Sequence, residues 1–154
     1  VVEKEQTIGF NQEEICFNKV TYSLWDVGGS GTIRCLWKHY GSGKDYLIYV
    51  VDSADREKLG EATEAFHDII DKEDFSKLPL LVLANKQDLE GAMSTREIAE
   101  HMELSRIPED RPVKVLGCSA VLQEGLTEGF QWFIDGTPLQ IREQAFKTAK
   151  SARS

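Results

Sequence analysis

The sequence predicts an α/β fold, with a mostly parallel β-sheet covered by helices on both faces. Apolar runs typical of strands alternate along the chain with segments of helical periodicity, an order that favours a parallel sheet. Several of these runs are continuously apolar, as is typical of strands buried on both faces. The 154 residues are enough for one domain with a hydrophobic core.

The first expected element is a β-hairpin. β-branched and aromatic residues in 14–17 and 20–27 flank the short polar pair Asn18-Lys19. A helix is expected next, because Ile33, Leu36, Trp37 and Tyr40 have the spacing of one apolar helical stripe.

The rest of the chain predicts strands and helices in alternation. Buried strands are expected at 46–53, 78–86 and 113–120. Helices are expected at 56–71, from 94 to about 103, and from 126 to 134. Ser94 and Glu97 fit a capping box, which marks the start of the second of these helices.

Composition excludes some function classes. The net charge of -8, from 18 basic and 26 acidic residues, argues against general nucleic-acid binding. The three cysteines, Cys16, Cys35 and Cys118, are odd in number and widely spaced, which suits reduced thiols in a cytoplasmic protein. No secretory signal is visible, and no apolar run reaches the ~18 residues of a membrane span.

Polar residues gather where the predicted strands end. They are Asp26, Asp52-Ser53, Asn85 to Asp88, and Ser119-Ala120. In parallel sheets, ligands bind beyond the carboxyl ends of the strands. The sequence therefore predicts one binding site at this edge.

The stretch "NKQD" from Asn85 to Asp88 suits a guanine base. The carboxylate of Asp88 can accept N1–H and the N2 amine side by side, a pair that adenine lacks, and such bidentate contacts discriminate by about 1–3 kcal/mol. Asn85 can tie neighbouring loops together, and the stem of Lys86 can lie along a base or sugar. Ser119 would brace the pocket, and the N–H of Ala120 would meet guanine O6. The alternative is an ordinary polar turn between a strand and a helix.

A second group of residues suits phosphate and Mg²⁺. Gly29 lets the backbone N–H approach a phosphate closely, since no Cβ stands in the way. Asp26 can hold a water on Mg²⁺, and the hydroxyl of Thr7 can ligate the same ion. The alternative for Gly28-Gly29 is a plain turn.

Together these segments resemble the ADP-ribosylation factor (Arf/Arl) family of small GTPases. "QTIGFN" resembles the first switch of the family, "WDVGG" with "IRCLWKHY" the second, and "VVDSADREKL" and "LLVLANKQDLEGAM" its body. The resemblance runs from about Glu5 to Ile134. It implies a small-GTPase-type fold, related to the P-loop NTPases, in which GTP and GDP bind with Mg²⁺ and GTP is hydrolysed slowly.

The resemblance also implies partners and a location. Phe10, Trp25 and Tyr40 match an aromatic triad that faces protein effectors, although the residues alone would favour core positions for Trp25 and Tyr40. An exchange factor and a GTPase activator are implied as regulators. Vesicle traffic is the implied process, and a cytoplasmic protein with peripheral contact to an intracellular membrane is the implied location.

Two departures from the family pattern bear on activity. Ser30 stands where the family usually has a glutamine that orients the attacking water, and its hydroxyl is too short for that role. The phosphate-binding loop with its strand and first helix is expected upstream of Thr7, where only six residues stand. The stretch "GSGKD" is no substitute, since Lys38 and Asp45 occupy positions that need Gly and Ser or Thr.

We therefore expect residues 1–137 to form an N-terminally incomplete Arf-like domain and 138–154 a polar, basic tail. About five charge-assisted hydrogen bonds to phosphate, on the order of 10 kcal/mol together, would be missing, so the chain alone should bind GTP and GDP weakly or not at all. Two interpretations stay open. One is a GTP-dependent switch, and the other is a degenerate interaction module that no longer binds nucleotide tightly.

Overall fold

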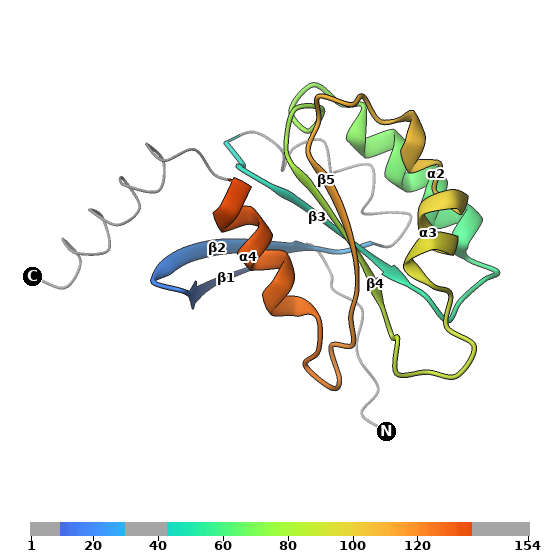
Figure 1. Ribbon diagram of the computed structural model, residues 1–154. Helices are drawn as coiled ribbons and strands as arrows, with labels where there is room; N and C mark the ends of the chain where they lie inside the picture. The colour runs from blue at the N-terminus through green and yellow to red at the C-terminus, as the bar shows by residue number, and fades with distance from the viewer. Residues whose placement is uncertain (1–9, 30–42, 137–154) are drawn as a thin grey trace, which may run out of the picture. The chain divides into compact units, whose positions relative to one another are not determined.

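The computed structural model describes residues 10–29 and 43–136 (Figure 1). The chain divides into two compact units, one containing 1–37 with 134–154 and the other 38–133, and each is described by itself. The predicted helix over 33–40 and the tail 138–154 lie outside the described residues, as do Thr7, Ser30 and Tyr40.

The first unit contains the predicted β-hairpin. Strand β1, Phe10–Phe17, pairs antiparallel with β2, Val20–Val27, and the register runs from Phe17 opposite Val20 to Phe10 opposite Val27. Asn18 and Lys19 both have positive φ, 47° and 65°, as a tight two-residue turn requires. The strand β1 begins at Phe10 rather than at the predicted Glu14. Residues 11–13 are polar and lack the apolar alternation that predicts a strand, but their backbones pair with β2.

The second unit contains a parallel sheet, as predicted. Its strands are β3, Leu47–Asp52, β4, Leu80–Asn85, and β5, Val113–Gly117, in the order β3-β4-β5. The described helices of this part of the chain are α2, Leu59–Ile70, α3, Thr95–His101, the short η2, Leu104–Arg106, and α4, Leu126–Gly136. None of the described helices has the length and apolarity needed to cross a bilayer.

Helices cover both faces of this sheet (Figure 1). On one face α4 packs on β4 and β5, where Leu81, Leu83, Cys118 and Phe133 form a buried cluster. Gly129 allows this close packing, since a Cβ there would lie 2.6 Å from Cδ2 of Leu81. On the other face, Phe66 of α2 and Ile98 of α3 are fully buried, and Phe66 meets the ring of Tyr49 edge to face.

The prediction that the strand at 46–53 is buried on both faces is wrong, because only Val51 of β3 is buried and its other residues are partly or fully exposed. Val50 is 59% exposed, whereas every residue of β4 except Asn85 is buried. Among the described strands β3 lies at an edge and β4 in the centre. The edge position explains the difference, because the helix that covers this face lies over β4 and β5.

Helix α2 begins at Leu59 rather than at Arg56. The carboxylate of Asp55 accepts a hydrogen bond from the backbone N–H of Lys58 at 3.1 Å. The residues between Asp55 and Leu59 therefore form a turn and are not part of the helix. The predicted capping box of α3 is confirmed: Ser94 Oγ accepts from the N–H of Glu97, and the carboxylate of Glu97 accepts from the N–H of Ser94.

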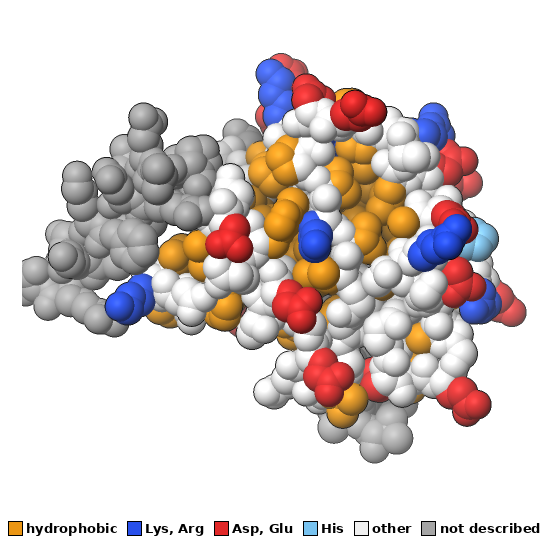
Figure 2. All heavy atoms as spheres, in the orientation of Figure 1, with side chains coloured by type: hydrophobic (Ala, Val, Ile, Leu, Met, Phe, Trp, Pro, Cys, Tyr) orange, Lys and Arg blue, Asp and Glu red, His pale blue; other side chains and the backbone are white. Residues whose placement is uncertain are grey.

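A buried arginine anchors the amino-terminal end of the sheet. Arg111 is 8% exposed, and its guanidinium donates to the carbonyl oxygens of Ile70, Phe75 and Leu78. Burial lowers the pKa of Arg111 and the charge of Asp71 acts in the opposite direction, but an arginine stays protonated in either case. Figure 2 shows acidic and basic side chains lying close together along the upper and right-hand rim of one face.

Candidate functional site

The loops that follow β4 and β5 meet at the carboxyl edge of the sheet. In Figure 1 both loops leave the same edge, and backbone bonds tie them together. The N–H of Cys118 donates to the carbonyl of Ala84 at 3.0 Å, and the N–H of Gln87 donates to that of Cys118 at 3.1 Å. Both predicted base-binding segments therefore lie at one place.

Asn85 joins the two loops through its side chain. Its Oδ1 accepts from the N–H of Ala120 at 3.0 Å and from Sγ of Cys118 at 3.6 Å. Burial raises the pKa of the Cys118 thiol, which keeps the thiol protonated and able to donate. This is the loop-tying role predicted for Asn85, but it already uses the N–H of Ala120 that was predicted to meet guanine O6. Guanine binding requires that Asn85 share or release this donor.

Asp88 is oriented by a buried serine. Ser119, 2% exposed, donates from Oγ to Oδ1 of Asp88 at 2.7 Å and accepts from the N–H of Leu122 at 3.2 Å. Oδ2 of Asp88 has no hydrogen-bond partner among the described residues, and each carboxylate oxygen can accept twice. The carboxylate is thus held by one oxygen and still offers an exposed edge to a ligand.

The loop after β5 is closed by its own backbone. Ser119 and Glu124 exchange two hydrogen bonds, of 3.1 and 3.0 Å. Gly125 follows with φ of 79°, and a Cβ there would collide with the carbonyl oxygen of Gly117. This tight closure fixes the backbone from which Ser119 and Ala120 reach the pocket.

Lys86 has a backbone conformation that is uncommon for a lysine. Its φ is 67°, in the left-handed region, and such residues often mark functional sites. Its Nζ forms an ion pair of 2.6 Å with Oδ2 of Asp52, while Oδ1 of Asp52 accepts the N–H of Ala54 at 2.9 Å. The sequence pattern places Asp52 at this edge of the sheet but does not predict a role for it in base binding. Its position at the end of the neighbouring strand was the available signal, because Asp52 pairs in register with Asn85.

Asp26 and Gly29 belong to the unit that contains the hairpin, whereas the loops after β4 and β5 belong to the other unit. Their positions are therefore described within the hairpin alone. Asp26 lies within β2 and is exposed, and no described atom comes within 4 Å of a Cβ built on Gly29. The described residues contain no cluster of three His, Cys, Asp or Glu side chains able to enclose a metal. A Mg²⁺ that keeps several waters needs no such cluster, and the oxygens of Asp26 and Thr7 are the hard donors it prefers.

The hairpin also presents an exposed aromatic pair. The rings of Phe10 and Trp25 stack with centroids 5.0 Å apart and planes inclined by 10°. The two side chains are 44% and 37% exposed, so Trp25 is a surface residue and its interpretation as a core residue is wrong. Gln12 donates to Oγ of Ser23 at 3.1 Å beside this pair.

The fold places the chain in the class of small GTPases. Among solved structures, the chain is similar to that of the Arl6 BBS3 small GTPase from Trypanosoma brucei with a bound nucleotide analogue, GppNp. The TM-score is 0.79 and the identity 27%, and the match covers 96% of this chain and 85% of the other. The chain belongs to the ADP-ribosylation factor family, whose family pattern matches residues 1–137.

Curated relatives agree with this assignment. The chain is similar to ADP-ribosylation factor K of Dictyostelium discoideum, 44% identical over 126 residues, which are 82% of this chain and 66% of that protein. It is 43% identical over 132 residues to ADP-ribosylation factor J of the same organism, covering 86% and 70%. It is 41% identical over 135 residues to ADP-ribosylation factor-like protein 2 of Arabidopsis thaliana, covering 88% and 73%. The matches thus span about two thirds to three quarters of the length of these relatives.

Proposed function

We propose that this chain is a guanine-nucleotide-binding switch that hydrolyses GTP slowly. The observation that carries the proposal is the pair of side-chain bonds between the two loops, Asn85 to Ala120 and Asp88 to Ser119. They hold a carboxylate in a fixed orientation at the carboxyl edge of a parallel sheet, where nucleotides bind in this class of fold. Membership of the ADP-ribosylation factor family supports the same function.

The selectivity for guanine follows from hydrogen-bond complementarity. Asp88 accepts from N1–H and the N2 amine of guanine, whereas adenine offers no such pair and leaves the carboxylate unsatisfied. The bond from Ser119 keeps one carboxylate oxygen in place, so little ordering is needed when the base enters. The N–H of Ala120 donates to guanine O6 once Asn85 shares it.

The residues proposed to bind the phosphates and Mg²⁺ precede the strands of the parallel sheet in the chain. Gly29 offers its N–H to the γ-phosphate, Thr7 ligates Mg²⁺ through its hydroxyl, and Asp26 holds the ion through a water. When bound, Mg²⁺ neutralises charge on the phosphate oxygens. Ser30 cannot orient the attacking water, so hydrolysis is slow without a protein activator.

Replacement of Ser30 by glutamine, in a protein extended upstream by a phosphate-binding loop, tests this account of hydrolysis. We expect Ser30→Gln to raise activator-stimulated turnover of GTP by about an order of magnitude or more, in line with what water positioning contributes. Unchanged turnover both with and without the activator would mean that Ser30 is not at the catalytic position.

The partners proposed are protein effectors, an exchange factor and a GTPase activator, in vesicle traffic at the cytoplasmic face of a membrane. The stacked pair of Phe10 and Trp25 supports an effector surface, since two large aromatic rings are exposed side by side. The same observation favours a second candidate function, an interaction module that works without nucleotide.

Competition between nucleotides tests the base pocket. GDP, ADP and XDP are titrated to millimolar concentration against the chain and against Asp88→Asn, with binding followed by NMR. We expect the chain to prefer GDP over ADP, and Asp88→Asn to lose GDP affinity about tenfold or more while gaining XDP, because an amide can donate to the extra carbonyl of xanthine. Equal binding of GDP and ADP by the unmodified chain would favour the interaction module.

A further inference from the structure

The ion pair between Asp52 and Lys86 joins the base pocket to the neighbouring strand. We propose that Asp52 is a positioning residue of the base pocket, which holds the ammonium of Lys86 so that the lysine stem forms a fixed wall for the guanine base. This inference rests on the proposed function and adds to it a residue from another strand, outside the loops that contact the base.

The carboxylate of Asp52 is fixed independently of Lys86. Its strand β3 pairs with β4 up to the register Asp52 opposite Asn85, and the N–H of Ser53 donates to the carbonyl of Asn85 at 3.0 Å. Oδ1 of Asp52 accepts the N–H of Ala54 at 2.9 Å, which leaves Oδ2 turned to Nζ of Lys86 at 2.6 Å. Asp52 therefore presents a preset acceptor to the lysine.

Lys86 needs such an acceptor. Its side chain is 48% exposed, and a free lysine has about 2 kcal/mol of rotamer entropy to lose on ordering. The left-handed backbone at φ of 67° sets only the direction in which the side chain leaves the loop. The ion pair orders the rest of the stem before the nucleotide arrives, which lowers the entropy cost of binding.

The ion pair also protects Asp88. Lys86 lies two positions before Asp88, whose outer carboxylate edge must stay available for the N–H donors of guanine. An untethered ammonium would be attracted to that carboxylate and would compete with the base. Partial burial acts to raise the pKa of Asp52, but the bonds from Lys86 and Ala54 lower it below the usual value, so Asp52 is ionised at neutral pH.

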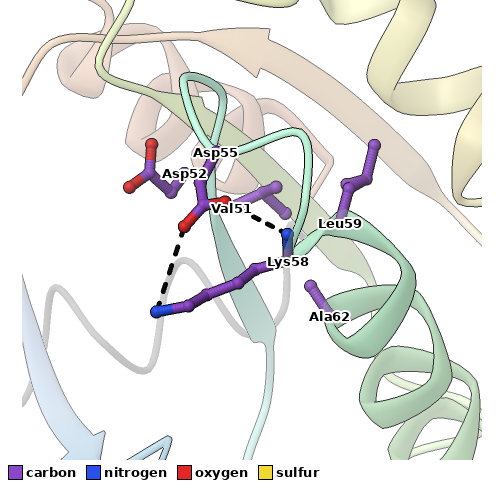
Figure 3. A pocket seen from close by; sticks show the side chains of 6 residues that line it. All are labelled: Val51, Asp52, Asp55, Lys58, Leu59 and Ala62. Carbon is purple, nitrogen blue, oxygen red and sulfur yellow. Dashed lines mark hydrogen bonds and ion pairs between the residues drawn. The ribbon is translucent and has the colours of Figure 1, made fainter.

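Two separate ion pairs lie close together here, Asp52 with Lys86 and Asp55 with Lys58. Asp52 also lines a cavity of about 150 Å³ with Asp55 and Lys58, as Figure 3 shows. Lys58 turns to Asp55 instead, with its backbone N–H at 3.1 Å and its Nζ at 4.0 Å from that carboxylate. Asp55 is thus a carboxylate of the same cavity with a different cation, which makes it a matched control.

The test is a double-mutant cycle on nucleotide affinity. The dissociation constant for GDP is measured by NMR titration for the unmodified chain, Asp52→Asn, Lys86→Met and the double variant, with Asp55→Asn as the control. Asparagine keeps the acceptor for Ala54, and it replaces the charged Oδ2 that accepts from Lys86 with an amide NH2, which cannot accept from the ammonium. We expect Asp52→Asn to weaken GDP binding about three- to tenfold, typical of one charge-assisted bond, with Asp55→Asn unchanged.

The coupling distinguishes positioning from a general loss of structure. We expect the double variant to bind GDP no more weakly than Lys86→Met, since Asp52 acts only through the lysine. Full additivity of the two losses, or an Asp52→Asn variant that binds like the unmodified chain, would overturn the inference. Equal binding of GDP and ADP by the unmodified chain would instead overturn the proposed function, and this result is visible before any variant is compared.

Discussion

Replacement of Ser119 by alanine is the most direct perturbation of the base pocket. The change removes one buried oxygen, which donates to Asp88 at 2.7 Å and accepts from the N–H of Leu122 at 3.2 Å. Asp88 then keeps its charge but loses the bond that orients it. The backbone N–H of Leu122 loses its acceptor at the same time.

The magnitude follows from these two bonds. A hydrogen bond to a charged group contributes about 1.5–3 kcal/mol, and the exposed Asp88 recovers part of that from water. We therefore expect GDP binding to weaken by about 1–2 kcal/mol, or roughly 5- to 30-fold. The lost acceptor of Leu122 should cost about 1 kcal/mol of folding stability, which lowers Tm by about 2–4 °C in a domain of this size.

The assay pairs GDP titration with thermal unfolding. Ser105→Ala is the control, because Ser105 is an exposed serine of η2, away from the pocket loops, and its loss should change neither quantity. If the Ser119→Ala variant binds GDP as well as the unmodified chain, orientation of Asp88 by Ser119 does not contribute to binding of the base, and the reasoning is refuted. A fall in Tm alone would show that Ser119 serves only the loop.

Three further predictions concern stability and reactivity. Arg111→Met should lower the free energy of unfolding in urea by about 3 kcal/mol, because its three carbonyl acceptors lose a charged donor, whereas Arg106→Met, at an exposed arginine, should leave it nearly unchanged; equal effects would contradict the anchoring role. Iodoacetamide at pH 8 should alkylate the exposed Cys16 of the native chain and spare Cys118, whose burial raises its pKa, so modification of both at one rate by mass spectrometry would be the contrary result. Gly125→Ala should cost about 2 kcal/mol or more of unfolding free energy, since its φ is positive and a Cβ meets a carbonyl; an unchanged urea midpoint would show that the loop can shift.

Local sequence signals predicted the elements that depend on local interactions. The hairpin around Asn18-Lys19 and the capping box of Ser94 with Glu97 were both confirmed, because their bonds join residues close in the chain. The predicted start of α2 at Arg56 was wrong, since an aspartate before a helix can either cap the helix or close a turn, and Asp55 closes a turn with the N–H of Lys58. The exposure of Val50 depends on where α4 packs, which periodicity within one strand cannot reveal.

The same distinction applies to the base pocket. The convergence of Asn85, Asp88, Ser119 and Ala120 followed from the rule that strand ends of a parallel sheet share an edge, and the loops do meet there. The partners within the pocket did not follow from that rule. The pairing of Asp52 with Lys86 depends on the register of β3 with β4 and on the left-handed backbone of Lys86. Neither of these can be predicted from composition or from residue spacing.

The central position of β4 has a consequence for synthesis of the protein. Leu80–Asn85 carries no charge and no proline, and its apolar residues are buried by elements on both sides. The strand β5 that covers one of its edges begins only at Val113, and α4 follows later still. Until the ribosome has produced these segments, the nascent chain exposes an apolar strand with an open edge, the kind of segment that pairs with other chains. Over this interval of translation we expect the chain to be most prone to aggregation.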